Sequence, residues 1–236
     1  MSLYGSTVLL PQYLQVWMGY SATNAGMVLS PGALVFVCLM PIIGRLLSRY
    51  DARYLIAFGF SVLTIALYHM SRTLYPGIDF STAVWMRIYV TTGLAFLFVP
   101  INTVVYAGVA PSKNNAVAGI VNLSRNMGGD IGIALVTTLI ARRAQVHQEH
   151  IATAVAGSAQ TFAARLSGIA QAFERAGMSS VQATKSAYAA IYRQVIQQAQ
   201  TLAYLDTLFV FACFAALMVP LVLLTKSAQG RAAASH

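Results

Sequence analysis

The stretch NLSRNMGGDIGIALVTTLIA, residues 122–141, decides the fold because it is part of a long apolar run and yet carries Arg125 and Asp130. A charge inside a membrane-length segment is costly and usually faces a protein interior or a water-filled cavity. In a helix, Asn122, Asn126 and Asp130 fall at i, i+4 and i+8 and therefore share one face. We expect this face to line a water-filled cavity, with bonding of Asp130 to a neighbouring helix as the alternative.

Two glycines mark the opposite face of the same helix. Gly128 and Gly132 form a small-xxx-small pair, a pattern that lets two membrane helices approach closely. At about 100° per residue, Asp130 points about 160° away from this glycine groove. The stretch therefore predicts a helix that packs on a neighbour with one side and presents polar groups with the other.

The composition indicates a polytopic membrane protein. Only 9% of the 236 residues are charged and 58% are apolar, whereas soluble domains average about 25% charged residues. The net charge of +9 comes from scattered basic residues and no basic run, which favours membrane topology over nucleic-acid binding. No enzyme motif and no metal-ligand set is recognised, so we expect neither catalysis nor a bound metal.

The hydropathy pattern predicts an all-α fold with six transmembrane helices, each needing about 20 apolar residues. The predicted spans are residues 3–18, 24–47, 54–71, 82–109, 116–141 and 201–225. Residues 1–141 would thus hold five transmembrane helices, and residues 226–236 would form a cytoplasmic tail.

Residues 142–200 differ from the rest because they are rich in Ala and Gln and lack an apolar run of membrane length. Phe162, Leu166, Ile169 and Phe173 recur at helical spacing, and Gly177 would end that helix. A second helix is expected after the Ser179-Ser180 pair. We predict an extracytoplasmic helical loop between the fifth and sixth spans.

The distribution of basic residues predicts that both termini are cytoplasmic. In that orientation six basic residues lie in inner segments and one, Arg72, borders an outer loop. The six are Arg45, Arg49, Arg53, Lys113, Lys226 and Arg231.

Five segments, in order, carry a resemblance to a known family. They are GYSATNAGMVLSPGAL (19–34), GRLLSRYDARYL (44–55), YPGIDF (75–80), APSKNNAVAGIVNLSRNMGGDIGIAL (110–135) and QTLAYLDTLF (200–209). Together they resemble the C-terminal half of EmrB/QacA-type multidrug–proton antiporters, the fourteen-helix branch of the major facilitator superfamily.

The resemblance implies part of a proton-coupled efflux transporter for amphipathic or cationic compounds in a bacterial inner membrane. It implies a proton gradient as energy source and no cofactor. The implied partners are the lipid bilayer, the missing N-terminal transporter half, small-molecule substrates and a periplasmic membrane-fusion protein of the EmrA type. The alternative is a truncated fragment or a noncatalytic membrane subunit without transport of its own.

The resemblance also implies a structural role for residues 44–55. Gly44, Arg49, Asp51 and Arg53 resemble the inter-helix loop motif of the superfamily, in which charges latch neighbouring helix ends. An ordinary positive-inside loop is the alternative.

Several polar groups inside or beside the predicted spans remain open to two interpretations. Gln12, Gln15, Asn102 and Tyr106 either line a cavity or form hydrogen bonds between helices. For Arg87, we favour snorkelling to the outer surface over contact with substrate or a carboxylate.

Three further groups are predicted to be structural or solvated. We expect Arg125 to bond loop carbonyls near the inner end of its helix. Asp206 is expected to cap the N-terminus of the sixth span, where a carboxylate complements the helix dipole. His147 and His150 have a ligand-like spacing, but without a third ligand we expect solvated loop histidines.

Overall fold

The computed structural model describes residues 10–16, 19–75, 77–107, 109–157 and 159–224, and every regular element in these ranges is a helix. The predicted all-α fold is thus confirmed. The chain divides into two units, which are described separately: unit 1 holds residues 1–137 and 207–236, and unit 2 holds residues 138–206.

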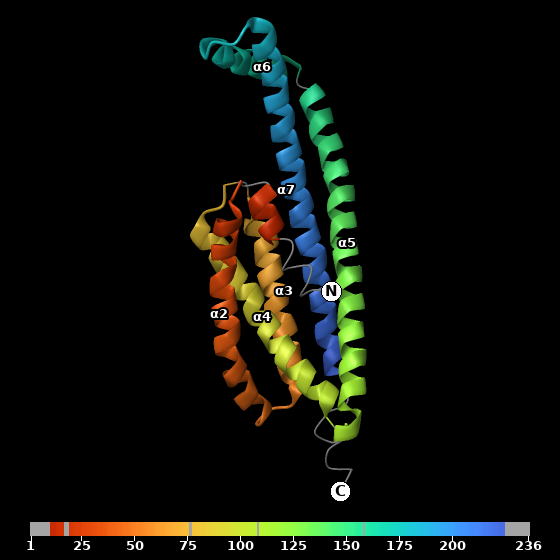
Figure 1. Cartoon of the computed structure of the whole chain (residues 1–236). Helices are drawn as coiled ribbons and strands as arrows, with labels where there is room; N and C mark the ends of the chain where they lie inside the picture. The colour runs from red at the N-terminus through yellow and green to blue at the C-terminus, as the bar shows by residue number, and fades with distance from the viewer. Residues whose placement is uncertain (1–9, 17–18, 76, 108, 158, 225–236) are drawn as a thin grey trace. The chain divides into compact units, whose positions relative to one another are not determined.

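Unit 1 contains three helices that lie side by side, α2 (Ala22–Leu47), α3 (Ala52–Thr73) and α4 (Phe80–Tyr106) (Figure 1). Polar caps begin two of them: Ser21 Oγ accepts from the Asn24 backbone N–H at 3.1 Å, and Asp79 accepts from Ser81. The short 3-10 helix η1 (Pro111–Lys113) precedes α5 (Asn114–Gly157).

Helix α4 packs against both α2 and α3, and glycines permit the close approach. A Cβ atom on Gly93 of α4 would lie 2.8 Å from the backbone nitrogen of Leu63 on α3. A Cβ atom on Gly59 of α3 would lie 3.0 Å from the backbone and side chain of Phe96. Small residues that bring backbones together are the usual interface of membrane helices, where apolar burial alone gives little net attraction.

Outward faces of the unit 1 helices carry large apolar side chains, such as Leu34, Val37 and Ile65, all of them exposed. Among the described residues, four helices are long and apolar enough to cross a membrane: α2, α3, α4 and α7 (Ser180–Leu223). The predicted first span lies largely outside the described residues, and residues 116–141 lie within α5, where the polar stripe lowers the hydropathy. The count of six spans therefore stays a prediction.

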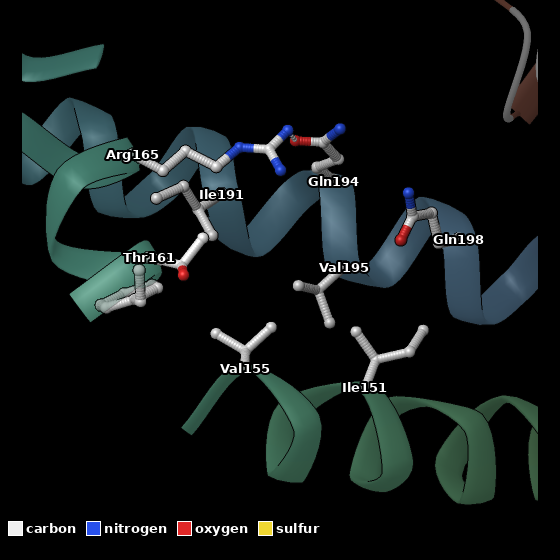
Figure 2. Close-up of a pocket in the computed structure, with 9 residues that line it drawn as sticks. Ile151, Val155, Thr161, Arg165, Ile191, Gln194, Val195 and Gln198 are labelled. Carbon is white, nitrogen blue, oxygen red and sulfur yellow. Dashed lines mark hydrogen bonds between the residues drawn. The ribbon is translucent and has the colours of Figure 1, made fainter. Parts of the chain in front are cut away.

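Unit 2 consists of the last part of α5, the helix α6 (Ala159–Arg175) and the first part of α7. These three segments surround an apolar hollow (Figure 2). The predicted break at Gly177 is confirmed, because α6 ends at Arg175, Gly177 has a φ of 95° and α7 begins at Ser180. The four apolar residues at helical spacing on α6 are all half-buried.

The predicted spans 116–141 and 201–225 lie inside longer helices. Helix α5 extends past residue 141 to Gly157, and α7 already begins at Ser180, so each helix is 44 residues long. Ala and Gln, which dominate residues 142–200, are good helix formers, so the helix outlasts the apolar run. At 1.5 Å per residue each helix is about 66 Å long, roughly twice the thickness of a bilayer core.

Candidate functional site

The polar stripe of α5 is exposed along its whole length. Asn122, Asn126 and Asp130 are each exposed, whereas Gly132 is buried. Gly128 is half-buried, so the packing of the glycine pair on a neighbouring helix stays a prediction. Among the described residues, no ion pair or hydrogen bond reaches the carboxylate of Asp130. The stripe thus offers two amides and one carboxylate to whatever lies beside α5.

Arg125, on the same helix, is held by α4. Its Nη2 donates to Asn102 Oδ1 at 3.1 Å, and its guanidinium carbon lies 5.2 Å from the ring centre of Phe98. Asn102 in turn donates from Nδ2 to the carbonyl of Phe98 at 2.6 Å. The expected partner of Arg125, a loop carbonyl, is replaced by the Asn102 amide and an aromatic ring. For Asn102, this contact corresponds to the predicted hydrogen bond between helices.

The guanidinium of Arg87 turns inward. Arg87 is half-buried on α4, its Cγ lies beside Gly32 of α2, and it lines a small space with Leu10 and Met70. Two of its nitrogens, Nε and Nη1, are buried without a hydrogen-bond partner among the described residues. The predicted snorkelling of Arg87 is therefore wrong, because Gly32 leaves room for the side chain inside the bundle.

Three other predicted pathway residues are on the surface of unit 1. Gln12, Gln15 and Tyr106 are all exposed, and none of them makes a side-chain hydrogen bond within the described part of the chain. Within the described residues, no side-chain hydrogen bond therefore joins these three to the α5 stripe.

The predicted loop latch lies between α2 and α3. Asp51 directly precedes α3, and its Oδ2 atom is 3.8 Å from Arg53 Nε. Arg53 also donates to the hydroxyl of Tyr54 at 2.9 Å and lies over that ring. Arg49 and Gly44 are exposed. The ion pair thus joins two residues of the same helix start, so a latch between helices stays a prediction.

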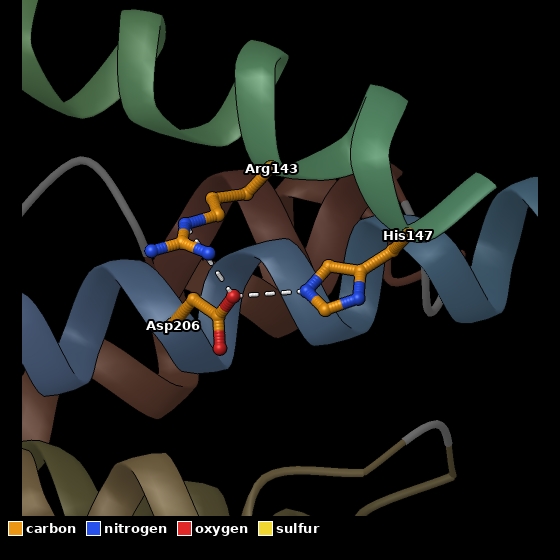
Figure 3. Close-up of polar contacts among 3 residues, drawn as sticks. All are labelled: Arg143, His147 and Asp206. Atoms are coloured by element: carbon orange, nitrogen blue, oxygen red, sulfur yellow. Dashed lines mark hydrogen bonds and ion pairs between the residues drawn. The ribbon is translucent and has the colours of Figure 1, made fainter. Parts of the chain in front are cut away.

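A second polar cluster lies in unit 2 (Figure 3). Asp206 Oδ2 is 2.9 Å from Nε2 of His147 and 3.7 Å from Nε of Arg143. Arg143 and His147 are four residues apart on α5, so both side chains face α7. The pairing combines a carboxylate, a guanidinium and an imidazole.

This cluster corrects two predictions. Asp206 does not cap a helix N-terminus, because it lies far inside α7, which begins at Ser180. His147 is not a solvated loop residue, because it lies within α5 and is half-buried against Asp206; His150 is exposed. The four-residue spacing of Arg143 and His147 could have indicated a shared basic face. Their partner Asp206 lies 59 residues after His147 along the chain, so the sequence alone did not pair them.

Comparisons with known proteins identify the family. The sequence profile of the Major Facilitator Superfamily matches residues 1–133. Over 155 residues the chain is 34% identical to the multidrug export protein EmrB of Escherichia coli (strain K12), covering 66% of this chain and 30% of that protein. It is 31% identical over 149 residues to the fatty acid resistance protein FarB of Neisseria gonorrhoeae, covering 63% and 29%.

A third relative extends the similarity along the chain. The colistin resistance protein EmrB of Acinetobacter baumannii is 24% identical over 212 residues, which cover 90% of this chain and 41% of that protein. The chain thus spans between 29% and 41% of the length of these relatives. The resemblance to EmrB-type transporters that the motifs indicated is confirmed. With a profile match over more than half of its residues, this multi-pass membrane protein belongs to the Major Facilitator Superfamily.

Proposed function

We propose that this chain is part of a proton-coupled efflux transporter for amphipathic or cationic compounds. The observation that carries the proposal is the exposed stripe of Asn122, Asn126 and Asp130 on α5. Against lipid tails these groups would lack hydrogen-bond partners at a high cost in free energy. A water-filled cavity beside α5 avoids that cost.

The second wall of this cavity would come from another six-helix half. Substrate sites in such transporters lie near the bilayer midplane, at the interface between structural repeats. Because the chain spans about 30% of the length of its EmrB relative, we infer that the other half belongs to the complete transporter. In the cavity, Asp130 would exchange a proton or bind a cationic substrate, and Asn122 and Asn126 would bond polar groups of the substrate.

We also propose an orientation and a partner. The bias of basic residues supports cytoplasmic termini in a bacterial inner membrane, with residues 142–200 on the outer side. The length of α5 and α7, about twice what a bilayer core needs, supports a position of that segment beyond the bilayer core, and the side follows from the basic-residue bias. A periplasmic membrane-fusion protein of the EmrA type would then meet the transporter on this side.

The test is pH-driven dye efflux by the full-length transporter carrying Asp130→Asn, normalised to its amount in the membrane. The amide keeps the size and most hydrogen bonding but cannot titrate, so we expect efflux of cationic dyes to fall at least tenfold and its pH dependence to flatten. Glu149→Gln is the matched control, since Glu149 is an exposed carboxylate in unit 2. Wild-type rates and pH dependence in Asp130→Asn would mean that Asp130 is structural.

The share of the relatives that the chain spans also favours a second candidate, a membrane segment without transport of its own. This chain alone, reconstituted in liposomes with an imposed pH gradient, should then move no more dye than empty vesicles. Saturable, gradient-dependent efflux would instead mean that copies of the chain build a cavity among themselves.

A further inference from the structure

The hollow in unit 2 is apolar along its floor. Figure 2 shows Ile151 and Val155 of α5 and Val195 of α7 pointing toward one another. Phe162 of α6 also lines the hollow. The space measures about 200 Å³. Its lining residues are Ile151, Val155, Thr161, Phe162, Arg165, Ile191, Gln194, Val195 and Gln198.

A second hollow, of about 390 Å³, adjoins the first. The two share four lining residues, Val155, Phe162, Ile191 and Val195. The second is bordered by the rings of Tyr188 and Phe162, whose centres lie 6.1 Å apart. Ligand sites in proteins usually measure about 300–1,000 Å³ and are mostly apolar with a few polar groups, so the two hollows together are large enough for a small amphiphile.

A cationic side chain, Arg165, lies at the edge of the first hollow. Nη2 of Arg165 donates to Oε1 of Gln194 at 3.0 Å, and within the described ranges no carboxylate pairs with Arg165. An amide orients the guanidinium without neutralising it. A guanidinium held in this way can bind a carboxylate or a similar anion through two parallel hydrogen bonds. Thr161, Gln194 and Gln198 add further polar groups to the same hollow.

The net positive charge of unit 2 favours an anionic ligand. Residues 138–206 contain six Lys or Arg against three Asp or Glu, and no acidic residue is among the described residues that line either hollow. A basic surface attracts anions, whereas a cationic amphiphile would meet Arg165 as a like charge.

We propose that unit 2 binds a single-chain amphipathic anion, of which a medium-chain carboxylate is the simplest example. The hydrocarbon chain lies between Val155 of α5 and Val195 of α7, and the carboxylate pairs with Arg165. The site is distinct from the polar stripe of α5, and the proposal concerns binding alone, so it does not depend on the proposed transport function.

Photolabelling of the purified full chain in nanodiscs of zwitterionic lipid tests the proposal. The probe is dodecanoate carrying a diazirine in its alkyl chain, and the labelled peptides are mapped by mass spectrometry. We expect saturable labelling of the peptides around Val155 and Val195, displaced by dodecanoate and not by dodecanol or dodecyltrimethylammonium. Labelling spread along α2, α3 and α4, or equal displacement by the neutral and cationic amphiphiles, would overturn the proposal.

Substitution of Arg165 separates the anion site from general lipid contact. Arg165→Gln should raise the half-saturating concentration about tenfold, as expected for the loss of a charged hydrogen bond, and Arg165→Lys should recover part of the binding. Arg193→Gln removes the same charge from an exposed position of α7 that lines neither hollow and should bind as wild type does. If all three variants bind equally, the anion site does not exist.

Discussion

Nε2 of His147 on α5 lies 2.9 Å from Oδ2 of Asp206 on α7, and Arg143 approaches the same oxygen at 3.7 Å. Both groups lie in unit 2, in helices that continue beyond the apolar runs from which the spans were predicted. Asp206 therefore pairs with two basic side chains. It lies in the interior of α7, so it cannot cap the start of that helix.

The pairing of α5 and α7 in unit 2 can be tested by cross-linking. In a background without Cys38 and Cys213, His147→Cys combined with Asp206→Cys should cross-link with a short bifunctional methanethiosulfonate. Glu149→Cys with Asp206→Cys is the control, because Glu149 is exposed and lies about 200° from His147 around the helix. Intramolecular cross-linking, read as a mobility shift in denaturing gels, should exceed the control several-fold. Equal yields would contradict the observed register.

The topology prediction uses two exposed serines. Ser167 lies on α6 in the segment proposed to be external, and Ser48 lies at the α2–α3 junction, proposed to be cytoplasmic. In the cysteine-free background, Ser167→Cys should react with a membrane-impermeant maleimide in spheroplasts with intact inner membranes. Ser48→Cys should react only after permeabilisation. The reverse labelling pattern would mean that the chain has the opposite orientation in the membrane.

The close packing of α3 on α4 predicts that alanine at Gly93 lowers stability, whereas alanine at a glycine outside this contact does not. Gly93→Ala should lower the melting temperature of the purified protein, because the new Cβ would lie 2.8 Å from the Leu63 backbone nitrogen, which cannot move independently. The expected cost is about 1–3 kcal/mol. Gly168→Ala on α6 is the control: it meets no atom within 4 Å and should be neutral or stabilising by about 0.5–1 kcal/mol. Similar melting temperatures for both variants would contradict the packing.

The start of α4 predicts a dependence on pH. Hydrogen bonds from Ser81, with a smaller contribution from Thr82, hold the pKa of Asp79 below its ordinary value of 3.8. A carboxylate with a depressed pKa in the folded state contributes stability that is present above 3.8 and is lost as the pH falls through the lower folded value. The melting temperature of wild type should therefore exceed that of Asp79→Ala at neutral pH, and the difference should shrink below pH 3.8.

Asp79→Asn completes this comparison. The asparagine side chain keeps an oxygen that can cap the helix but does not titrate, so its advantage over Asp79→Ala should not change with pH. If the wild-type advantage over Asp79→Ala is also independent of pH, the cap does not depend on the charge of Asp79.

Some features of the protein follow from local patterns that the sequence displays directly. The apolar composition determined the membrane class, and the spacing of Asn122, Asn126 and Asp130 placed them on one shared stripe of α5, where all three are exposed. Gly177, which adopts a positive φ, determined the break between α6 and α7. Each is a property of one helix or one turn, for which periodicity and backbone conformational preference are sufficient information.

Other features were decided only by the tertiary structure. Arg125 bonds Asn102 across 23 residues, His147 meets Asp206 across 59, and Arg165 reaches Gln194 across 29. Hydropathy located apolar runs but not the ends of α5 and α7, because Ala and Gln prolong a helix after the apolar residues stop. Which side chains then face each other depends on the register between separate helices, and no single helix carries that information.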